Sequence, residues 1–160
     1  MPMANENEMP EIPQFQIDIR GQFIKDLSFE NPNFVEMMSS NQSTPDVDIK
    51  INVHHEKLPQ PDTHEISLIV QTKAEKGGKP LFLLELTYSG IFTITNAPEN
   101  ILHPILMIEC PRLLFPFVRN IISDVSRDGG YPPLMLKPVD FAELYRMQIE
   151  KMSAAPQGTA

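Results

Sequence analysis

The feature that most constrains the fold is a long alternation of apolar and polar side chains in the first half of the chain. Residues 15–30 alternate throughout, with the apolar side chains mainly at odd positions, and residues 47–54 repeat the pattern. Successive side chains of a β-strand point to opposite faces, so each run predicts a strand with one buried and one solvated face. Gly21, inside the first run, predicts a bulge or bend in that strand.

Two more strands are predicted on either side of a glycine turn. Residues 66–73 and 82–88 alternate, and Lys76-Gly77-Gly78-Lys79 joins them. Because glycine adopts positive φ without steric cost, this join predicts a hairpin turn. In the fourth strand the inward positions are Phe82, Leu84, Leu86 and Tyr88, and the outward positions are Leu83, Glu85 and Thr87. Four half-buried strands are typical of an antiparallel sheet.

The second half of the chain changes to a helical period. Apolar side chains between residues 113 and 125 recur at helical spacing, which predicts a long helix that stops at Gly129-Gly130. Pro116 fits this helix if it lies in the first turn, where a missing N–H costs nothing.

A second helix is predicted after an extended segment. Residues 131–139 contain three prolines and must be extended. Asp140 then begins a C-terminal helix, because Asp140 and Glu143 have the spacing of a capping box. A four-stranded antiparallel sheet packed with a long helix and a C-terminal helix is an α+β fold.

The length of 160 residues argues for one domain, which we place at residues 15–152. Residues 1–14 are polar and acidic and predict a disordered N-terminal arm, and residues 153–160 predict a flexible C-terminal tail. The start of the chain has no basic segment followed by an apolar one, so no targeting signal is predicted. Prolines and charges interrupt the most apolar stretch, 101–118, so we expect no membrane insertion and a cytoplasmic protein.

The charge of the chain restricts its partners. The formal net charge is −8 and the pI is about 4.9, which disfavours nucleic acid and anionic lipid surfaces as partners. A lone cysteine, Cys110, forms no internal disulfide, and its apolar neighbours predict a small core residue.

No catalytic residue, metal site or cofactor is predicted. The four histidines and Cys110 lack the spacing of metal ligands, and the sequence has no nucleophile elbow and no phosphate-binding loop. We expect the histidines to be solvated or bonded locally. Carboxylates such as Asp26 and Glu30 lie on an outward strand face, where they are either a solvated surface or a docking patch.

Three features bear on binding. The 101–125 segment is apolar on more than one side, which fits either a well-covered core helix or a helix at a subunit interface. Leu83 shares the polar face with Glu85, where it is either an isolated exposed leucine or an interface anchor. The nine methionines are either core filler or an adaptable apolar surface.

Four sequence blocks resemble one family. They are residues 23–33 (FIKDLSFENPN), 90–94 (GIFTI), 110–119 (CPRLLFPFVR) and 132–141 (PPLMLKPVDF). Together, and in this order, they resemble SecB, the bacterial protein-export chaperone family, from about residue 15 to 150. The resemblance implies a cytosolic homotetramer, a dimer of dimers with helices packed between sheets. It also implies an ATP-independent chaperone that keeps unfolded secretory precursors translocation-competent and delivers them to the SecA ATPase.

The resemblance also assigns site residues. Positions that contact SecA in the family fall on Asp26, Glu30, Leu83 and Glu85. The client groove falls on Phe23, Phe141 and Tyr145, and assembly positions fall on Leu84, Leu86 and Tyr88. A sheet order of 2-3-4-1 would set the first and fourth strands side by side. The acidic C-terminal tail common in the family is missing here, since residues 151–160 contain no acid.

Other classes of function stay open from the residues alone. A curved antiparallel sheet covered by helices is also the frame of small α+β proteins that bind an apolar ligand or act as isomerases. Such a site needs polar side chains pointing into the core, and the inward positions here are nearly all apolar. A purely structural oligomer is a third possibility.

Overall fold

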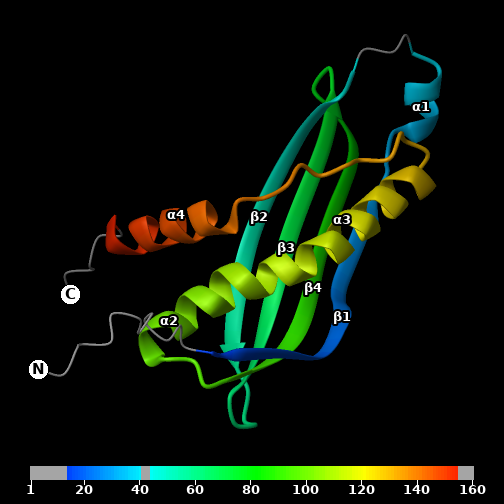
Figure 1. The fold of residues 1–160 in the computed structure, drawn as a ribbon. Coiled ribbons are helices and arrows are strands. Elements are labelled where there is room, and N and C mark those ends of the chain that lie inside the picture. The colour runs from blue at the N-terminus through cyan, green and yellow to red at the C-terminus, as the bar shows by residue number, and fades with distance from the viewer. Residues whose placement is uncertain (1–13, 41–43, 155–160) are drawn as a thin grey trace, which may run out of the picture.

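The structure is a four-stranded antiparallel sheet crossed on one face by a long helix (Figure 1). This computed structural model describes residues 14–40 and 44–154. The elements are β1 (Gln16–Glu30), α1 (Phe34–Met38), β2 (Asp46–Lys57), β3 (Thr63–Lys76), β4 (Lys79–Thr95), α2 (Glu99–Pro104), the π-helical turn η1 (Ile105–Glu109), α3 (Cys110–Asp128) and α4 (Phe141–Ala154). The sheet order is β1-β4-β3-β2, which is the predicted order 2-3-4-1 read from the other edge. The α+β fold is therefore confirmed.

The core lies between the sheet and the long helix. We call the sheet face that α3 covers the inner face and the opposite one the outer face. Side chains that alternate along β3 and β4 are buried on the inner face, among them Ile66, Leu68, Val70, Leu84, Leu86 and Phe92. From α3 the buried residues recur at helical spacing: Cys110, Leu114, Val118 and Ile122. The hairpin turn is confirmed, since Gly77 and Gly78 have φ of 57° and 79°.

Strand β1 departs from the predicted alternation. Its register against β4 shifts between Ile19 and Gly21 and again between Ile24 and Asp26. Each shift moves the following side chains to the other face. Phe23 therefore lies opposite Ser89 on the outer face, and Ile24 lies opposite Tyr88 on the inner face. The bulge at Gly21 is confirmed, but the single apolar face predicted for residues 15–30 is wrong.

The long helix begins earlier than its apolar spacing predicts. Helices α2 and α3 and the π-helical turn between them form one stretch, Glu99–Asp128. Pro116 lies inside α3, so its predicted place in the first turn is wrong; Pro111 lies there instead. Pro116 and Arg112 are both exposed, so water can satisfy the carbonyl of Arg112 that the proline leaves unbonded. By length and composition this stretch could cross a membrane, but one side of it packs on the sheet.

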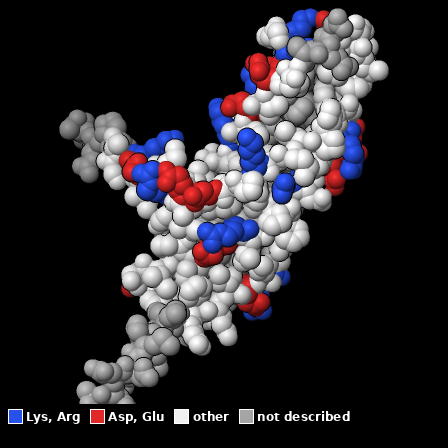
Figure 2. Space-filling model, turned by 45° about the horizontal axis from the view of Figure 1, so that its top comes forward, with Lys and Arg blue, Asp and Glu red and all other residues white. Residues whose placement is uncertain are grey.

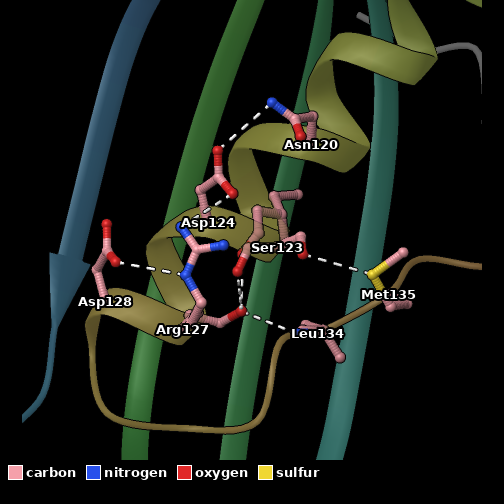
Figure 3. Close-up of polar contacts among 9 residues, drawn as sticks. Asn120, Ser123, Asp124, Arg127, Asp128, Leu134 and Met135 are labelled. Carbon is pink, nitrogen blue, oxygen red and sulfur yellow. Dashed lines mark hydrogen bonds and ion pairs between the residues drawn. The ribbon is translucent and has the colours of Figure 1, made fainter.

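The long helix ends in a glycine cap that starts the extended segment. Gly130 has φ of 96°, and the N–H groups of Gly130 and Tyr131 donate to the carbonyls of Arg127 and Ser126 at 3.0 and 3.1 Å. The hydroxyl of Ser126 then accepts the N–H of Leu134 at 2.9 Å, while Ser123 Oγ contacts Met135 Sδ (Figure 3). These bonds hold the start of the extended segment along the last turns of α3.

The C-terminal helix is capped as predicted. The backbone N–H of Glu143 donates to Asp140 Oδ1 at 3.1 Å. Helix α4 runs to Ala154, so Ser153 and Ala154 of the predicted tail are helical. The rest of that tail and residues 1–13 of the predicted arm lie outside the described residues. In Figure 1, α4 projects beyond the β2 edge of the sheet, away from β1.

Candidate functional site

The outer face carries a group of acidic side chains around one leucine, which we call the acidic face: Asp26, Glu30, Leu83 and Glu85. Strand pairing places Glu30 opposite Leu83 and Asp26 opposite Thr87, so β1 and β4 present these residues together. Leu83 is half-buried between them. Glu85 accepts a hydrogen bond from Gln71 Nε2 at 2.9 Å, which fixes its carboxylate beside β3.

Two lysines near the acidic face are engaged with other carboxylates. Lys73 pairs with Glu75 and Lys25 pairs with Glu65, each at 2.9 Å. These hydrogen bonds raise the pKa of both lysines, so both stay charged. Asp26 and Glu30 form no ion pair with any described residue. Lys50 of β2 lines the same hollow as Asp26 and Glu85, but it forms no ion pair with a described residue. The carboxylates of the acidic face therefore stay available to a basic partner.

The predicted assembly residues lie inside the subunit. Leu84, Leu86 and Tyr88 are buried on the inner face. Tyr88 also contacts an exposed side chain. Its ring stacks on Phe117 with centroids 6.1 Å apart, and Phe117 is 48% exposed. Phe117 belongs to an apolar patch where α3 approaches β1. We call it the edge patch: Ile24, Leu27, Leu113 and Phe117, each exposed by more than 40%.

A groove runs between β2 and α4, which we call the α4 groove. Two adjoining hollows, of about 370 and 500 Å³, share Gln148 and Lys151. The apolar part of the lining is Ile51, Val53, Met107, Leu144, Tyr145, Met147, Ile149 and Met152. Three of these are methionines, whose flexible side chains adapt to irregular apolar partners.

The predicted groove residues fall in three different places. Tyr145 lines the α4 groove. Phe141 is fully buried at the start of α4 against the ring of Phe115, so it anchors the helix. Phe23 lies on the outer face of β1, at the opposite edge of the sheet from β2. Within one chain the structure does not bring Phe23 together with the other two.

Histidines from three elements meet beneath the groove. His55 Nε2 and His64 Nδ1 share a hydrogen bond of 2.8 Å, and the ring of His103 lies 6.4 Å from that of His55. His103 Nδ1 is 2.7 Å from the Tyr145 hydroxyl, which ties α2 to α4. Spacing in the sequence did not predict this cluster, because His103 comes to the two strand histidines from α2, far along the chain. Among the described residues, no three His, Cys, Asp or Glu side chains are grouped to hold a metal ion.

Burial lowers the pKa of both His55 and His64, and their mutual charge repulsion lowers that of His55 further. Lys57 also lowers the pKa of His64, while Asp62 raises it.

Unfolded histidines titrate near 6.5, so below that pH the unfolded chain binds more protons than the folded one. The free energy of unfolding should therefore have its full value above pH 6.5 and should fall as the pH drops towards the lowered pKa values of the two folded histidines. The urea midpoint at pH 7.5 and 5.5 measures this loss, and His64→Gln should lose less than the parent.

The single cysteine is inert. Cys110 is buried at the start of α3, and burial raises the pKa of its thiol to about 12. The thiolate is the reactive form, so Cys110 is no nucleophile at neutral pH. Its predicted role as a core residue is confirmed.

Comparison with known proteins gives one family. The model of the family described as "Preprotein translocase subunit SecB" matches residues 10–152. The chain is 46% identical over 157 residues to the protein-export protein SecB of Nitrobacter winogradskyi, covering 97% of this chain and 98% of that protein. It is 48% identical over 155 residues to that of Bradyrhizobium diazoefficiens, covering 96% of each. A SecB-like chaperone of Mycobacterium tuberculosis, solved with a ChAD peptide from an antitoxin, has a similar fold. Its TM-score is 0.63 at 12% identity, over 77% of this chain and 90% of that one.

Proposed function

The chain belongs to the SecB family and is a chaperone of protein export, and from this premise we propose how it handles its clients. It holds unfolded secretory precursors in the α4 groove, in the cytoplasm and without ATP, and delivers them to the SecA ATPase. It catalyses no reaction. The observation that carries the proposal is the α4 groove itself, which is apolar, rich in methionine and open along the β2 edge. An extended segment can bury apolar side chains there while its backbone stays solvated or pairs with β2.

Tyr145 tests the position of the client site. Tyr145→Asp should weaken binding of an unfolded precursor about 10-fold or more, because it removes apolar area and places a charge in the groove. Tyr145→Phe is the matched control: it removes only the hydroxyl bonded to His103 and should retain binding. Fluorescence titration with a slowly folding precursor measures both. Unchanged affinity in Tyr145→Asp, with the fold intact by circular dichroism, would place the client site elsewhere.

We also propose that four copies assemble as a dimer of dimers. The edge patch leaves apolar area uncovered in a single chain, which favours burial against a second copy. The exposed side of α3 is charge-complementary to itself when reversed. With two copies antiparallel about the level of Val118, Arg112 would lie opposite Asp124 of the partner subunit, and Glu109 opposite Arg127 of the partner subunit. Within one chain these charges form weak exposed pairs. Arg112 pairs with Glu109 at 2.9 Å, and Arg127 pairs with Asp124 at 3.2 Å, as Figure 3 shows.

Light scattering tests the assembly. We expect about four times the 18.2 kDa chain mass at micromolar concentration. Arg112→Glu should lower the mass, because it places like charges opposite one another. In the double variant with Asp124→Arg both charges are reversed, so opposite charges face each other again and the mass should be restored. A single-chain mass for the unmodified protein would contradict the assembly. A mass unaffected by Arg112→Glu would contradict the antiparallel pairing of α3.

A further inference from the structure

Three histidines connect α4 to the body of the molecule, and we call them the histidine cluster: His55 of β2, His64 of β3 and His103 of α2. His55 Nε2 and His64 Nδ1 share a hydrogen bond of 2.8 Å, and the ring of His103 packs against that of His55. His103 also contacts α4, since its Nδ1 lies 2.7 Å from the hydroxyl of Tyr145 and the two rings are 5.4 Å apart. The cluster thus links the β2–β3 pair through α2 to α4.

The half of α4 beyond Tyr145, residues 146–154, has few other attachments among the described residues, and we call it the outer half. Phe141 anchors the start of the helix in the core, but Glu143 and Glu150 bind Arg146 of the same helix. Figure 2 shows α4 projecting from the body, with red and blue side chains next to each other. The apolar side chains of the outer half are exposed: Met147, Ile149 and Met152. The contact with the histidine cluster is therefore placed to decide whether the outer half stays on the β2 edge.

The floor of the α4 groove is covered while α4 is in place. Val53 and Met107 line the hollow of about 500 Å³, and each is only 9% exposed. If the outer half moved away, these side chains and the apolar side of the helix would become accessible to a bound segment. Release of the outer half thus adds apolar area to the groove.

Protonation opposes the closed arrangement of the cluster. In the bond between His55 and His64 one nitrogen donates and the other accepts, so the bond is lost when both rings are protonated. Burial lowers the pKa of His55, and the charges of His64, His103 and His54 lower it further. Histidines released from these contacts titrate near 6.5, so below that pH the open form binds more protons than the closed one. Acid therefore favours the open form.

The side chains that surround the cluster are mainly basic or uncharged. Burial and Lys57 lower the pKa of His64, while Asp62, in the loop between β2 and β3, raises it. From α4, Lys151 lines the same hollow as two of the cluster histidines, and η1 contributes the uncharged Met107. Of these neighbours, only Asp62 favours a protonated cluster.

The remaining acids near the cluster face away or are exposed. Glu56 and Glu65 each follow a cluster histidine in its strand, so alternation places them on the outer face, where both act on Lys25. On α2, Glu99 lies one turn before His103 and is exposed, so water weakens its attraction for a charged ring. Protons taken up by the cluster therefore repel one another with little compensation.

We propose that the histidine cluster is a proton-sensitive latch for α4. On acidification the outer half leaves the β2 edge, with Phe141 as the pivot, and uncovers the floor of the α4 groove, so that unfolded segments bind there more tightly. The movement of α4 rests on the cluster alone, whereas the gain in client affinity also rests on the proposed function.

A nitroxide attached at Met152→Cys reports the movement of α4. The native Cys110 does not take the label, because it is buried and burial raises the pKa of its thiol to about 12. In the full-length protein the mobility of the nitroxide should rise between pH 7.5 and 5.5, while circular dichroism in the near and far ultraviolet shows that the fold is retained. His103→Gln can still bond to Tyr145 but takes up no proton, so it should suppress the rise. His54→Gln, the same change at an exposed histidine outside the cluster, should preserve most of it.

Titration with a histidine-free unfolded polypeptide measures the effect on clients, because this probe has no histidine of its own to titrate. We expect its affinity to rise about 5-fold or more from pH 7.5 to 5.5, at the lower end of typical coupling between linked sites. His103→Gln should show little pH dependence. Tyr145→Phe keeps the ring contact but loses the hydrogen bond, so its α4 should open at a higher pH than that of the parent.

The outcomes separate the latch from the proposed function. A nitroxide signal that is the same at both pH values, a rise that His103→Gln leaves intact, or a rise that His54→Gln removes would overturn the latch. Loss of the near-ultraviolet signal at pH 5.5 would also overturn it, since acid would then disrupt the whole domain. If α4 opens without a gain in affinity, the latch holds but its effect on clients is wrong. If, in addition, Tyr145→Asp binds the polypeptide as the parent does, the client groove itself fails.

Discussion

Glu85→Lys is expected to lower the affinity for SecA roughly 10-fold or more and to flatten its dependence on salt. The reason is the position of Glu85 beside Leu83 at the centre of the acidic face, where Gln71 fixes its carboxylate. Like charges brought together across an interface cost several kcal/mol, whereas a leucine in the middle can serve as a desolvated anchor. A SecA titration at two salt concentrations measures both effects. Client binding should stay nearly unchanged, since the acidic face lies on the side of the sheet opposite the long helix.

Two further variants make this result specific. Glu99→Lys makes the same charge change at an exposed residue of α2 and should leave the SecA affinity within a few-fold of the parent. Deletion of residues 153–160 should also matter less than Glu85→Lys, because these residues contain no acid. If the deletion abolishes binding and Glu85→Lys does not, the acidic face is not the SecA site.

Gly90→Val is expected to destabilise the fold and to loosen the long helix from the sheet. A methyl group added at Gly90 would lie 2.6 Å from Cε2 of Phe92 and 2.8 Å from Cδ2 of Leu114. Overpacking of this kind costs about 1–3 kcal/mol, which lowers the melting temperature of a domain this size by roughly 2–12 °C. Because α3 carries the proposed subunit contacts, the assembled mass should fall as well. Thermal unfolding and light scattering report the two effects.

The control for Gly90 is another glycine of the same sheet. Nothing lies within 4 Å of a methyl group added at Gly21, so Gly21→Val should change the melting temperature little. Leu114→Ala in the Gly90→Val background opens space on the helix side and should recover part of the assembly while costing core area. Equal melting temperatures for Gly90→Val and Gly21→Val would contradict the close approach of α3.

Local pattern predicted those parts of the fold that depend on neighbours in sequence. Alternation identified the strands, and glycine and capping residues identified the hairpin and the helix ends. The faces of β1 were predicted wrongly, because the second bulge depends on its pairing with β4 and no glycine marks it. For the long helix, apolar spacing identified only residues 113–125, while the helical reading of 101–125 rested on its apolar character. Three prolines (Pro104, Pro111 and Pro116) interrupt the spacing of a helix that packs on the sheet from Glu99 onward.

The candidate sites also divide into residues that local pattern predicted and residues that it could not predict. The outward positions of Leu83 and Glu85 follow from strand periodicity, and the pairing of β1 with β4 brings Asp26 and Glu30 beside them. The α4 groove and its histidines could not be predicted from spacing. Residues such as His55 and Tyr145 meet only because an extended segment returns α4 to the β2 edge. Such contacts depend on the path of the whole chain, which the local sequence pattern does not determine.

The bulges of β1 reduce the risk that a chaperone that binds unfolded chains starts their aggregation at this edge. In one chain the sheet has two edges, β1 and β2. A foreign strand needs a regular row of N–H and C=O groups to extend a sheet indefinitely, and the two register shifts in β1 interrupt that row. Strand β2 pairs with β3 without a shift over its whole length, and α4 lies along that edge. Strand β2 is thus the edge with a regular row of backbone groups, whereas the shifts in β1 leave the opposite edge without a row along which further strands could add.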